Sequence, residues 1–136
     1  MVSAGTTFTN DLLPRAFDID GVSIKTSDPT EETLETFVRR GTTIGACCVI
    51  GPGIELGEYC MIGMGSVVTR DVAPYQLVFG NPAKPKGFVC VCGEILVKGE
   101  PRETSLTCSK CRRQYEVRAK GTRLKAKGSR LKAKGL

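Results

Sequence analysis

Four cysteines near the end of the chain have the spacing of metal ligands. One residue separates Cys90 from Cys92, two separate Cys108 from Cys111, and fifteen lie between the pairs. Two such pairs on hairpins bind Zn²⁺ in a closed tetrahedral site, and a small β module with little core needs a crosslink of this kind. The sequence therefore predicts a zinc-ribbon-like module at 87–117 with a structural, non-catalytic zinc. A rubredoxin-like iron site and a metal-free module are the alternatives.

Composition restricts the remaining chemistry. The 136 residues contain no histidine, which excludes a histidine general base and any histidine-ligated metal, including the metal centre of a β-helix carbonic anhydrase. Residues 1–16 lack the charged start and apolar run of a signal peptide, and no apolar run is long enough to cross a membrane. Seven cysteines then suit a reducing, cytoplasmic location, as metal ligands and buried thiols instead of disulfides.

Aliphatic side chains recur every six residues between Val38 and Val68, and the structure that they predict must hold the rest of the chain in place. Neither a helix nor a simple alternating strand has this period, which is typical of a hexapeptide parallel β-helix whose coils stack because none can bury its apolar face alone. Glycine follows four of the repeated aliphatics and allows close backbone approach. The aliphatics are Val38, Ile44, Ile50, Leu56, Ile62 and Val68.

The repeat defines an all-β domain over 1–86. Small side chains four residues after each aliphatic should point inward, so Cys48 and Cys60 are expected to be buried structural thiols. Val2 and Phe8, six apart, indicate the end of an earlier coil, and residues 11–37 break the period as a projecting loop. Two full coils are fewer than a solenoid needs alone, which predicts either a trimer or a truncated form.

Residues 118–136 form a basic, repetitive tail. They hold eight of the twenty Lys and Arg side chains and no acid, so residues 1–117, with the other twelve and fourteen acids, carry a net charge of −2. Residues 122–128 and 129–135 repeat one motif with little apolar content, which predicts disorder. Binding to phosphates, nucleic acid or an acidic surface is the alternative, although no aromatic platform accompanies the cations.

Several motifs carry a family resemblance. Hexapeptide repeats followed by GNPAK at 80–84 resemble the left-handed β-helix acyltransferases that use acetyl-CoA, and residues 62–84 look like the last coil and exit of that superfamily. FTNDLLPRA, residues 8–16, is similar to the motif that opens the projecting loop in nucleotide-linked amino-sugar N-acetyltransferases. Cys-x-Cys-Gly after GNPAK also occurs in that group. The resemblance covers about residues 2–117.

The resemblance implies an acetyl-CoA-dependent N-acetyltransferase that acts as a homotrimer on a nucleotide-linked amino sugar, a small-molecule substrate. In this group no strong base is needed, since the departing CoA thiolate can take the proton. Asn10 is the candidate catalytic residue, holding the amine or the acetyl oxygen by hydrogen bonds. A turn asparagine is the alternative for Asn10.

The CoA site is expected in a groove between neighbouring prisms. Glycine-rich corners would expose backbone amides to the pantetheine arm, and lysines after the prism would meet the CoA phosphates. A solvated loop is the alternative for the lysines. The expected residues are Cys47, Gly63, Met64, Gly65, Ser66, Asn81, Pro82, Lys84 and Lys86.

A rival function of another class fits the same features. A truncated, non-catalytic trimeric β-helix with a zinc ribbon could serve as a scaffold or binding module. Neither a membrane nor nucleic acid is the favoured partner in either case.

Overall fold

The computed structural model describes residues 1–118 and 123–127, and these residues form β-strands and turns without a helix. Seven two-residue strands are followed by longer ones. They are β1 (Thr7–Phe8), β2 (Phe37–Val38), β3 (Thr43–Ile44), β4 (Val49–Ile50), β5 (Glu55–Leu56), β6 (Met61–Ile62), β7 (Val67–Val68), β8 (Gln76–Gly80), β9 (Ala83–Val89), β10 (Ile95–Lys98), β11 (Ser105–Thr107), β12 (Gln114–Arg118) and β13 (Arg123–Ala126).

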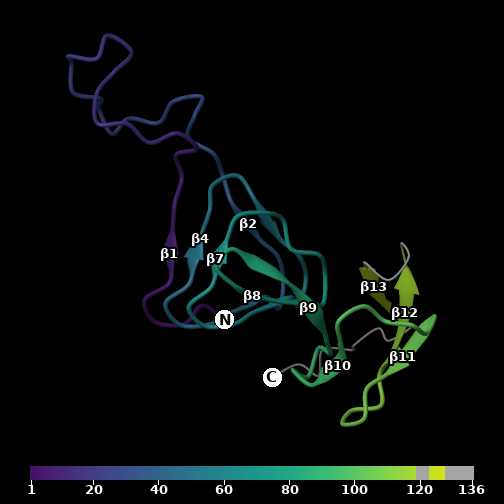
Figure 1. Ribbon diagram of the computed structural model, residues 1–136. Helices are drawn as coiled ribbons and strands as arrows, with labels where there is room; N and C mark the ends of the chain where they lie inside the picture. Colours follow the sequence, from purple (N-terminus) through teal and green to yellow (C-terminus); the bar gives the residue numbers. More distant parts are fainter. Residues whose placement is uncertain (119–122, 128–136) are drawn as a thin grey trace, which may run out of the picture.

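The short strands stack in parallel as three faces of a prism, seen end-on in Figure 1. One face pairs β1 with β4 and β4 with β7, the second pairs β3 with β6 and β6 with β8, and the third pairs β2 with β5. Val2 adds a parallel bridge to Ile44, so the first residues belong to an earlier coil, as their spacing predicts. The domain is the predicted left-handed parallel β-helix.

The repeated aliphatics from Ile44 to Val68 form the core of the prism, whereas Val38 in the first coil is 44% exposed. Ile44, Ile50 and Leu56 are fully buried, and the inward small residues Cys48 and Cys60 are equally inaccessible. Aliphatics of successive coils pair in register, for example Ile44 with Ile62 and Ile50 with Val68. The predicted burial is confirmed for the aliphatics from Ile44 onward and for the two thiols.

The glycines that follow four of the aliphatics keep neighbouring coils in contact. A Cβ on Gly45 would lie 2.5 Å from the backbone nitrogen of Met64, and one on Gly57 would lie 2.5 Å from that of Pro74. Real Cβ atoms do not approach backbone atoms this closely, so a side chain at either position would push the coils apart. Close backbone approach, the role expected for these glycines, therefore accounts for Gly45 and Gly57.

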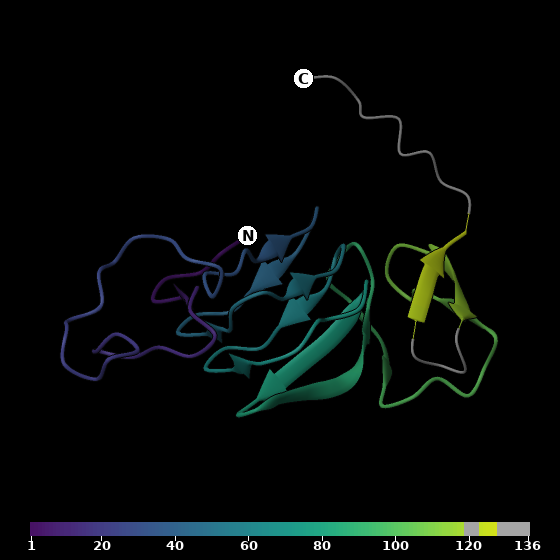
Figure 2. The same cartoon turned by 90° about the horizontal axis from the view of Figure 1, so that it is seen from above.

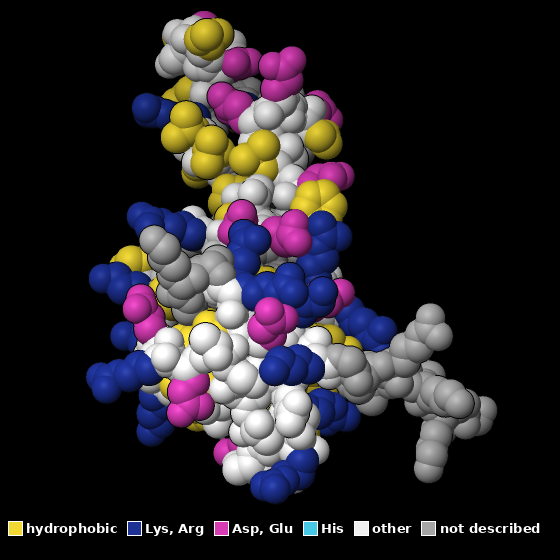
Figure 3. All heavy atoms as spheres, turned by 90° about the vertical axis from the view of Figure 1, so that its right-hand side faces the viewer, with side chains coloured by type: hydrophobic (Ala, Val, Ile, Leu, Met, Phe, Trp, Pro, Cys, Tyr) yellow, Lys and Arg dark blue, Asp and Glu magenta, His cyan; other side chains and the backbone are white. Residues whose placement is uncertain are grey.

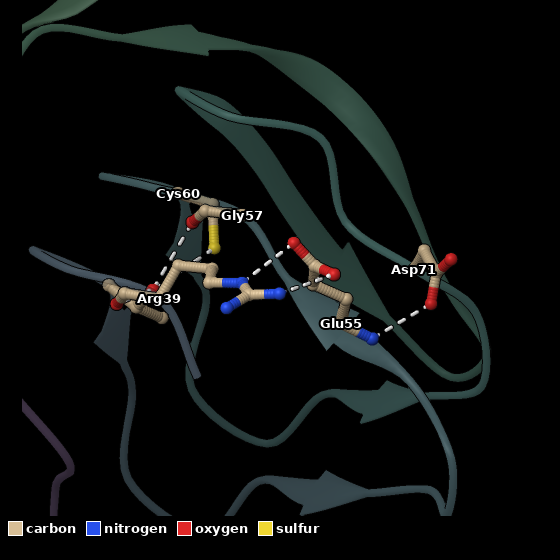
Figure 4. Close-up of polar contacts among 6 residues, drawn as sticks. Arg39, Glu55, Gly57, Cys60 and Asp71 are labelled. Atoms are coloured by element: carbon tan, nitrogen blue, oxygen red, sulfur yellow. Dashed lines mark hydrogen bonds and ion pairs between the residues drawn. The ribbon is translucent and has the colours of Figure 1, made fainter. Parts of the chain in front are cut away.

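Ionic contacts join neighbouring coils on the outside of the β2–β5 face (Figure 4). The Arg39 guanidinium donates to both carboxylate oxygens of Glu55, at 2.8 and 3.0 Å, and the Glu55 backbone N–H donates to Asp71 Oδ1 at 2.8 Å. Arg39 also lies over the Phe37 ring. The Arg39 hydrogen bonds lower the pKa of the exposed Glu55 carboxyl.

The chain between β1 and β2 projects away from the prism (Figures 1 and 2). Its ends meet at its base, where the Leu34 N–H donates to the Asn10 carbonyl at 2.7 Å. A Lys25–Glu32 ion pair of 3.0 Å closes it further out. Apolar side chains gather on it in Figure 3, and the exposed ones are Leu12, Leu13, Phe17, Ile19, Val22 and Ile24.

The exit from the prism is an antiparallel extension of one face. Strands β8, β9 and β10 continue the sheet that contains β3 and β6, and β9 runs through residue 86, where the sequence placed the domain boundary. The turn between β8 and β9 contains Asn81 and Pro82, joined by a cis peptide bond.

The final module contains β11, β12 and β13 in one antiparallel sheet. β13 comes from the segment predicted to be a disordered tail, and this part of the prediction is wrong. Leu124 is buried in the core of the module, which accounts for the order of this strand. The predictions for 119–122 and 128–136 lie outside the described residues.

None of the residues that the structure describes forms a helix with the length and apolar character needed to cross a membrane.

Candidate functional site

The corner between β3 and β4 brings together several residues expected to bind CoA. Cys47 adopts a left-handed conformation there, with φ of 57°, and is exposed. Its N–H donates to the Ala4 carbonyl, and the Gly65 N–H of the next coil donates to the Ala46 carbonyl at 2.8 Å. Gly5, Cys47 and Gly65 therefore stack at one corner, as the eighteen-residue spacing of Cys47 and Gly65 predicts. Met64, beside Gly65, is 80% exposed.

Ser66 connects this corner to the exit turn. Its side chain is fully buried, its hydroxyl donates to the Gly63 carbonyl, and it accepts the Gly80 N–H at 3.3 Å. Gly80 directly precedes Asn81 in the turn. The Ser66 hydroxyl is thus occupied inside the prism and is not available to a ligand.

The two exit lysines lie in different surroundings. The Lys86 ammonium is 5.2 Å from the centre of the Phe79 ring, and a Cβ on Gly63 would lie 2.7 Å from Phe79 Cβ, so Lys86 is near the Gly63–Ser66 corner. Lys84 and Pro82 instead line a cavity of about 250 Å³ at the end of the prism, with the last-coil residues Val68, Val72 and Val78.

Asn10 lies apart from this corner. It follows β1, whereas Cys47 precedes β4, and these strands pair in parallel on one face. The two residues therefore occupy opposite edges of that face, and one chain does not bring them into a single site. The Asn10 backbone carbonyl anchors the projecting loop, and the residue is exposed.

The second candidate site is the cysteine cluster. Cys90 and Cys92 lie in the turn after β9, and Cys108 and Cys111 lie in the turn between β11 and β12. Their four Sγ atoms all lie within 4.8 Å of one another. The Sγ–Sγ distances are 3.3 Å for Cys90–Cys111 and 3.7 Å for Cys92–Cys108. The structure thus brings together all four predicted ligands.

The thiols of the protein ionise unequally. Burial raises the pKa of Cys90 to about 12, whereas the Arg113 backbone N–H lowers the pKa of Cys111 to about 6. Burial also raises the pKa of Cys60 to about 11. Cys60 is therefore a neutral packing group at neutral pH, while the cluster includes a thiol that readily becomes a thiolate.

Tyr115 is a residue of this cluster that sequence reasoning missed. Its fully buried ring places the hydroxyl 3.0 Å from Cys90 Sγ, and that hydroxyl accepts the Val91 N–H at 3.1 Å. From sequence, Tyr115 appears only as an apolar strand residue. A tyrosine soon after the second cysteine pair, in a strand returning toward the first, is the signal that could have identified it.

Parts of this chain are similar in sequence to a known protein family and to known acetyltransferases. Residues 35–70 match the family described as bacterial transferase hexapeptide (six repeats). The dTDP-3-amino-3,6-dideoxy-alpha-D-galactopyranose 3-N-acetyltransferase of Aneurinibacillus thermoaerophilus is 56% identical over 57 residues, which are 42% of this chain and 30% of that protein. A chloramphenicol acetyltransferase of Klebsiella aerogenes is 43% identical over 58 residues, 38% of this chain and 28% of that one.

The solved structures to which the chain is similar include AntD, an N-acyltransferase from Bacillus cereus in complex with dTDP and 3-hydroxybutyryl-CoA. It is 20% identical with a TM-score of 0.47, and the alignment covers 62% of this chain and 45% of AntD. The polySia-specific acetyltransferase NeuO is 22% identical with a TM-score of 0.48, over 72% of this chain and 41% of NeuO.

The chain spans 30% or less of the length of the two curated relatives named above. Its repeats match the family within 35–70, the part that forms most of the prism. Residues 35–70 thus match bacterial transferase hexapeptide repeats, and the chain resembles the left-handed β-helix acyltransferases, in particular the nucleotide-linked amino-sugar N-acetyltransferases.

Proposed function

We propose that this chain acts in an acetyl-CoA-dependent N-acetyltransferase whose acceptor is the amino group of a nucleotide-linked amino sugar. The observation that carries the proposal is the 56% identity to an N-acetyltransferase named for a dTDP-linked 3-amino sugar. The stacked corner at Cys47 and Gly65 supports it, because exposed backbone groups at such a corner can hydrogen-bond the amides of the pantetheine arm.

The working unit in this proposal is a homotrimer. Asn10 and Cys47 lie at opposite edges of the same prism face. When two prisms lie side by side, the Asn10 edge of one copy can face the Cys47 edge of its neighbour. Each groove then combines an acceptor-binding edge from one copy with a CoA-binding edge from the next, which agrees with the heterologous contacts of a closed ring.

The chemistry needs few side chains. The neutral amine attacks the thioester carbonyl, the carbon–sulfur bond of the tetrahedral intermediate breaks, and the departing CoA thiolate takes the proton of the new amide nitrogen. The Asn10 side-chain amide can donate a hydrogen bond to the acetyl oxygen as negative charge develops on it, or accept one from the amine. Lys86 beside Phe79, and Lys84 two residues earlier in β9, provide cations for the CoA phosphates.

A structural Zn²⁺ held by Cys90, Cys92, Cys108 and Cys111 is the second bound group in the proposal. Zn–S bonds of about 2.3 Å in a tetrahedron place sulfurs about 3.8 Å apart. The sulfur separations of 3.3 and 3.7 Å, with all four within 4.8 Å, are compatible with that arrangement after small adjustments. Four thiolates leave no position for substrate, so zinc would stabilise the fold. A cytoplasmic location, where thiols remain reduced, is part of the same proposal.

Calorimetry with CoA and acetyl-CoA tests the function directly. The zinc-loaded protein should bind both ligands, and dephospho-CoA should bind more weakly if lysines contact the ribose phosphate. Lys86→Ala should weaken CoA binding, whereas Lys98→Ala on β10 serves as a lysine control outside the proposed site. Lack of CoA binding by a trimer would exclude the enzyme and favour the non-catalytic scaffold.

A further inference from the structure

The Tyr115 hydroxyl is hydrogen-bonded in the core of the cysteine module. The side chain is 0% exposed, and its hydroxyl has two polar neighbours among the described residues, the Val91 N–H at 3.1 Å and Cys90 Sγ at 3.0 Å. An N–H can only donate, so the Val91 contact uses the oxygen as an acceptor. The hydroxyl proton must then find its own acceptor, because buried donors are almost always satisfied.

Cys90 Sγ is the acceptor that this geometry provides. If the Cys90 thiol donated to Tyr115 instead, the phenol proton would be buried without a partner. An O–H to sulfur hydrogen bond is strongest when the sulfur is a thiolate, as in a metal ligand. Hydrogen bonds to ligand atoms orient them and tune the metal, and their loss commonly weakens metal binding by about 10–100-fold.

The Tyr115 ring also connects the cluster to the prism. It meets the Tyr75 ring edge-on at 5.3 Å, and Tyr75 stacks on Tyr59 at 5.7 Å. Tyr59 belongs to a coil corner, where its N–H donates to the Arg40 carbonyl, and the Tyr75 N–H donates to the Glu58 carbonyl of the same corner. The three rings therefore form one continuous column from a coil corner to the sulfur of Cys90.

We propose that Tyr115 is the positioning residue of the cysteine metal centre, donating its hydroxyl hydrogen bond to the metal-bound Cys90 sulfur. Through the Tyr115–Tyr75–Tyr59 column, metal binding fixes the cysteine module against the last coil. This inference rests on the zinc site proposed above. It adds a residue outside the four ligands and a mechanical role for the metal.

The first experiment measures metal content and ligand spectra in the full chain. The purified protein should contain one Zn²⁺ per chain, and Co²⁺ exchanged into it should give the intense absorption of a tetrahedral thiolate site. Cys92→Ser should lose the metal, while Cys47→Ser, which changes a cysteine outside the cluster, should retain it. Absence of metal after reconstitution, bound iron in place of zinc, or two disulfides in the cluster would overturn the zinc site and the role of Tyr115 together.

The second experiment isolates the hydroxyl. Tyr115→Phe should lower Zn²⁺ affinity, measured by chelator competition, by about 10–100-fold. It should also move the thiolate-to-Co²⁺ charge-transfer band to lower energy, since the Cys90 sulfur loses a hydrogen bond. Tyr59→Phe makes the same chemical change away from the cysteines and should alter neither value. Normal affinity and an unshifted band in Tyr115→Phe would overturn the inference while leaving the zinc site intact.

Hydrogen exchange tests the mechanical role. Chelation should reduce protection at the Val89 amide, which donates to the Tyr75 carbonyl at 2.8 Å, and at the Val91 amide. The Gly51 amide, which donates to the Val68 carbonyl inside the prism, should remain protected. Unchanged protection at Val89 after complete metal removal would show that the module docks without the metal and would overturn this part of the proposal.

Discussion

At the residue scale, the absence of a side chain at Gly41 makes room for an aromatic ring. A Cβ on Gly41 would lie 2.2 Å from Tyr59 Cδ1, so the Tyr59 ring rests directly on the glycine. Gly41 also has a φ of 73°, which disfavours any L side chain. One small residue in the coil thus seats the first ring of the aromatic column that reaches the cysteine cluster.

Gly41→Ala should therefore destabilise the protein by displacing that ring. Gly65→Ala is the matched control, because Gly65 has the same position in the six-residue repeat, at another corner, and a similar φ of 69°, but no atom lies within 4 Å of an added Cβ. Gly41→Ala is expected to cost about 1–3 kcal/mol more than Gly65→Ala in the free energy of unfolding, the usual cost of overpacking. Denaturant unfolding of both variants measures it. Equal losses would mean that the Tyr59 ring moves aside freely.

Asn10→Ala should reduce acetyl transfer without weakening CoA binding. Loss of one hydrogen-bond donor to a developing oxyanion lowers kcat by on the order of 10²–10³-fold. Asp11→Asn is the neighbouring control, because the Asp11 side chain contacts Thr33 in the loop and has no place in the proposed chemistry. Steady-state kinetics and calorimetry together check the prediction. Full activity in Asn10→Ala would show that Asn10 is a turn residue and takes no part in acetyl transfer.

At the element scale, the coils depend on strands only two residues long. In β4, Ile50 points into the prism and is fully buried, while Val49 points outward and is 37% exposed. Such a short strand has little intrinsic stability, so its place depends on the stacked inward side chain and on backbone bonds to adjacent coils, such as Gly51 N–H to the Val68 carbonyl. Stability should therefore be concentrated in one residue of each strand.

Ile50→Ala should cost about 2–5 kcal/mol in the free energy of unfolding, the range for buried large-to-small substitutions. Val49→Ala, its outward neighbour in the same strand, should cost less than about 1 kcal/mol, because surface substitutions have small effects. Thermal or denaturant unfolding distinguishes the two. A large loss in Val49→Ala would instead indicate that this outer face is buried by another chain.

Most elements of the prism were predictable because the inward aliphatics repeat without a gap. The cysteine module was predictable as a cluster, since the spacing of thiols carries information that does not depend on the surrounding strands. β13 was missed because Arg123, Lys125 and Lys127 resemble a solvated tail. The decisive feature, Leu124 alternating with these cations and facing a core, becomes evident only when β12 is available to pair with it.

At the scale of the whole molecule, the proposed site needs more than one chain. Asn10 and the Cys47–Gly65 corner lie at opposite edges of one face, and the Lys84 cavity is at the end of the prism. The sequence could assign these residues to a site by resemblance, but their separation on one prism could not be predicted, because it depends on which corner each residue occupies. Trimers assembled from two different variants therefore test whether the site is shared between copies.

Two inactive variants should restore activity when mixed. Asn10→Ala damages the acceptor edge, and Cys47→Trp should fill the CoA edge, whereas Cys47→Ser should leave that edge open. In randomly mixed trimers, about a quarter of the grooves should combine an intact Asn10 with an intact Cys47 corner. The expected result is about a quarter of the activity of the unmodified protein. Native mass spectrometry verifies that hybrid trimers have formed. Verified hybrids without activity would show that both residues act within one copy.

The tied base of the projecting loop has an evolutionary consequence. Because the Leu34 N–H reaches the Asn10 carbonyl at 2.7 Å, the chain leaves and re-enters the coil at nearly one point. Doubling the length of a flexible loop costs only about 0.6 kcal/mol in closure entropy. Insertions, deletions or wholesale exchange between Asn10 and Leu34 would therefore leave the register of the coils unchanged. A lineage can diversify this segment while inheriting the scaffold intact, and recombination at these two positions is a practical route to chimeras.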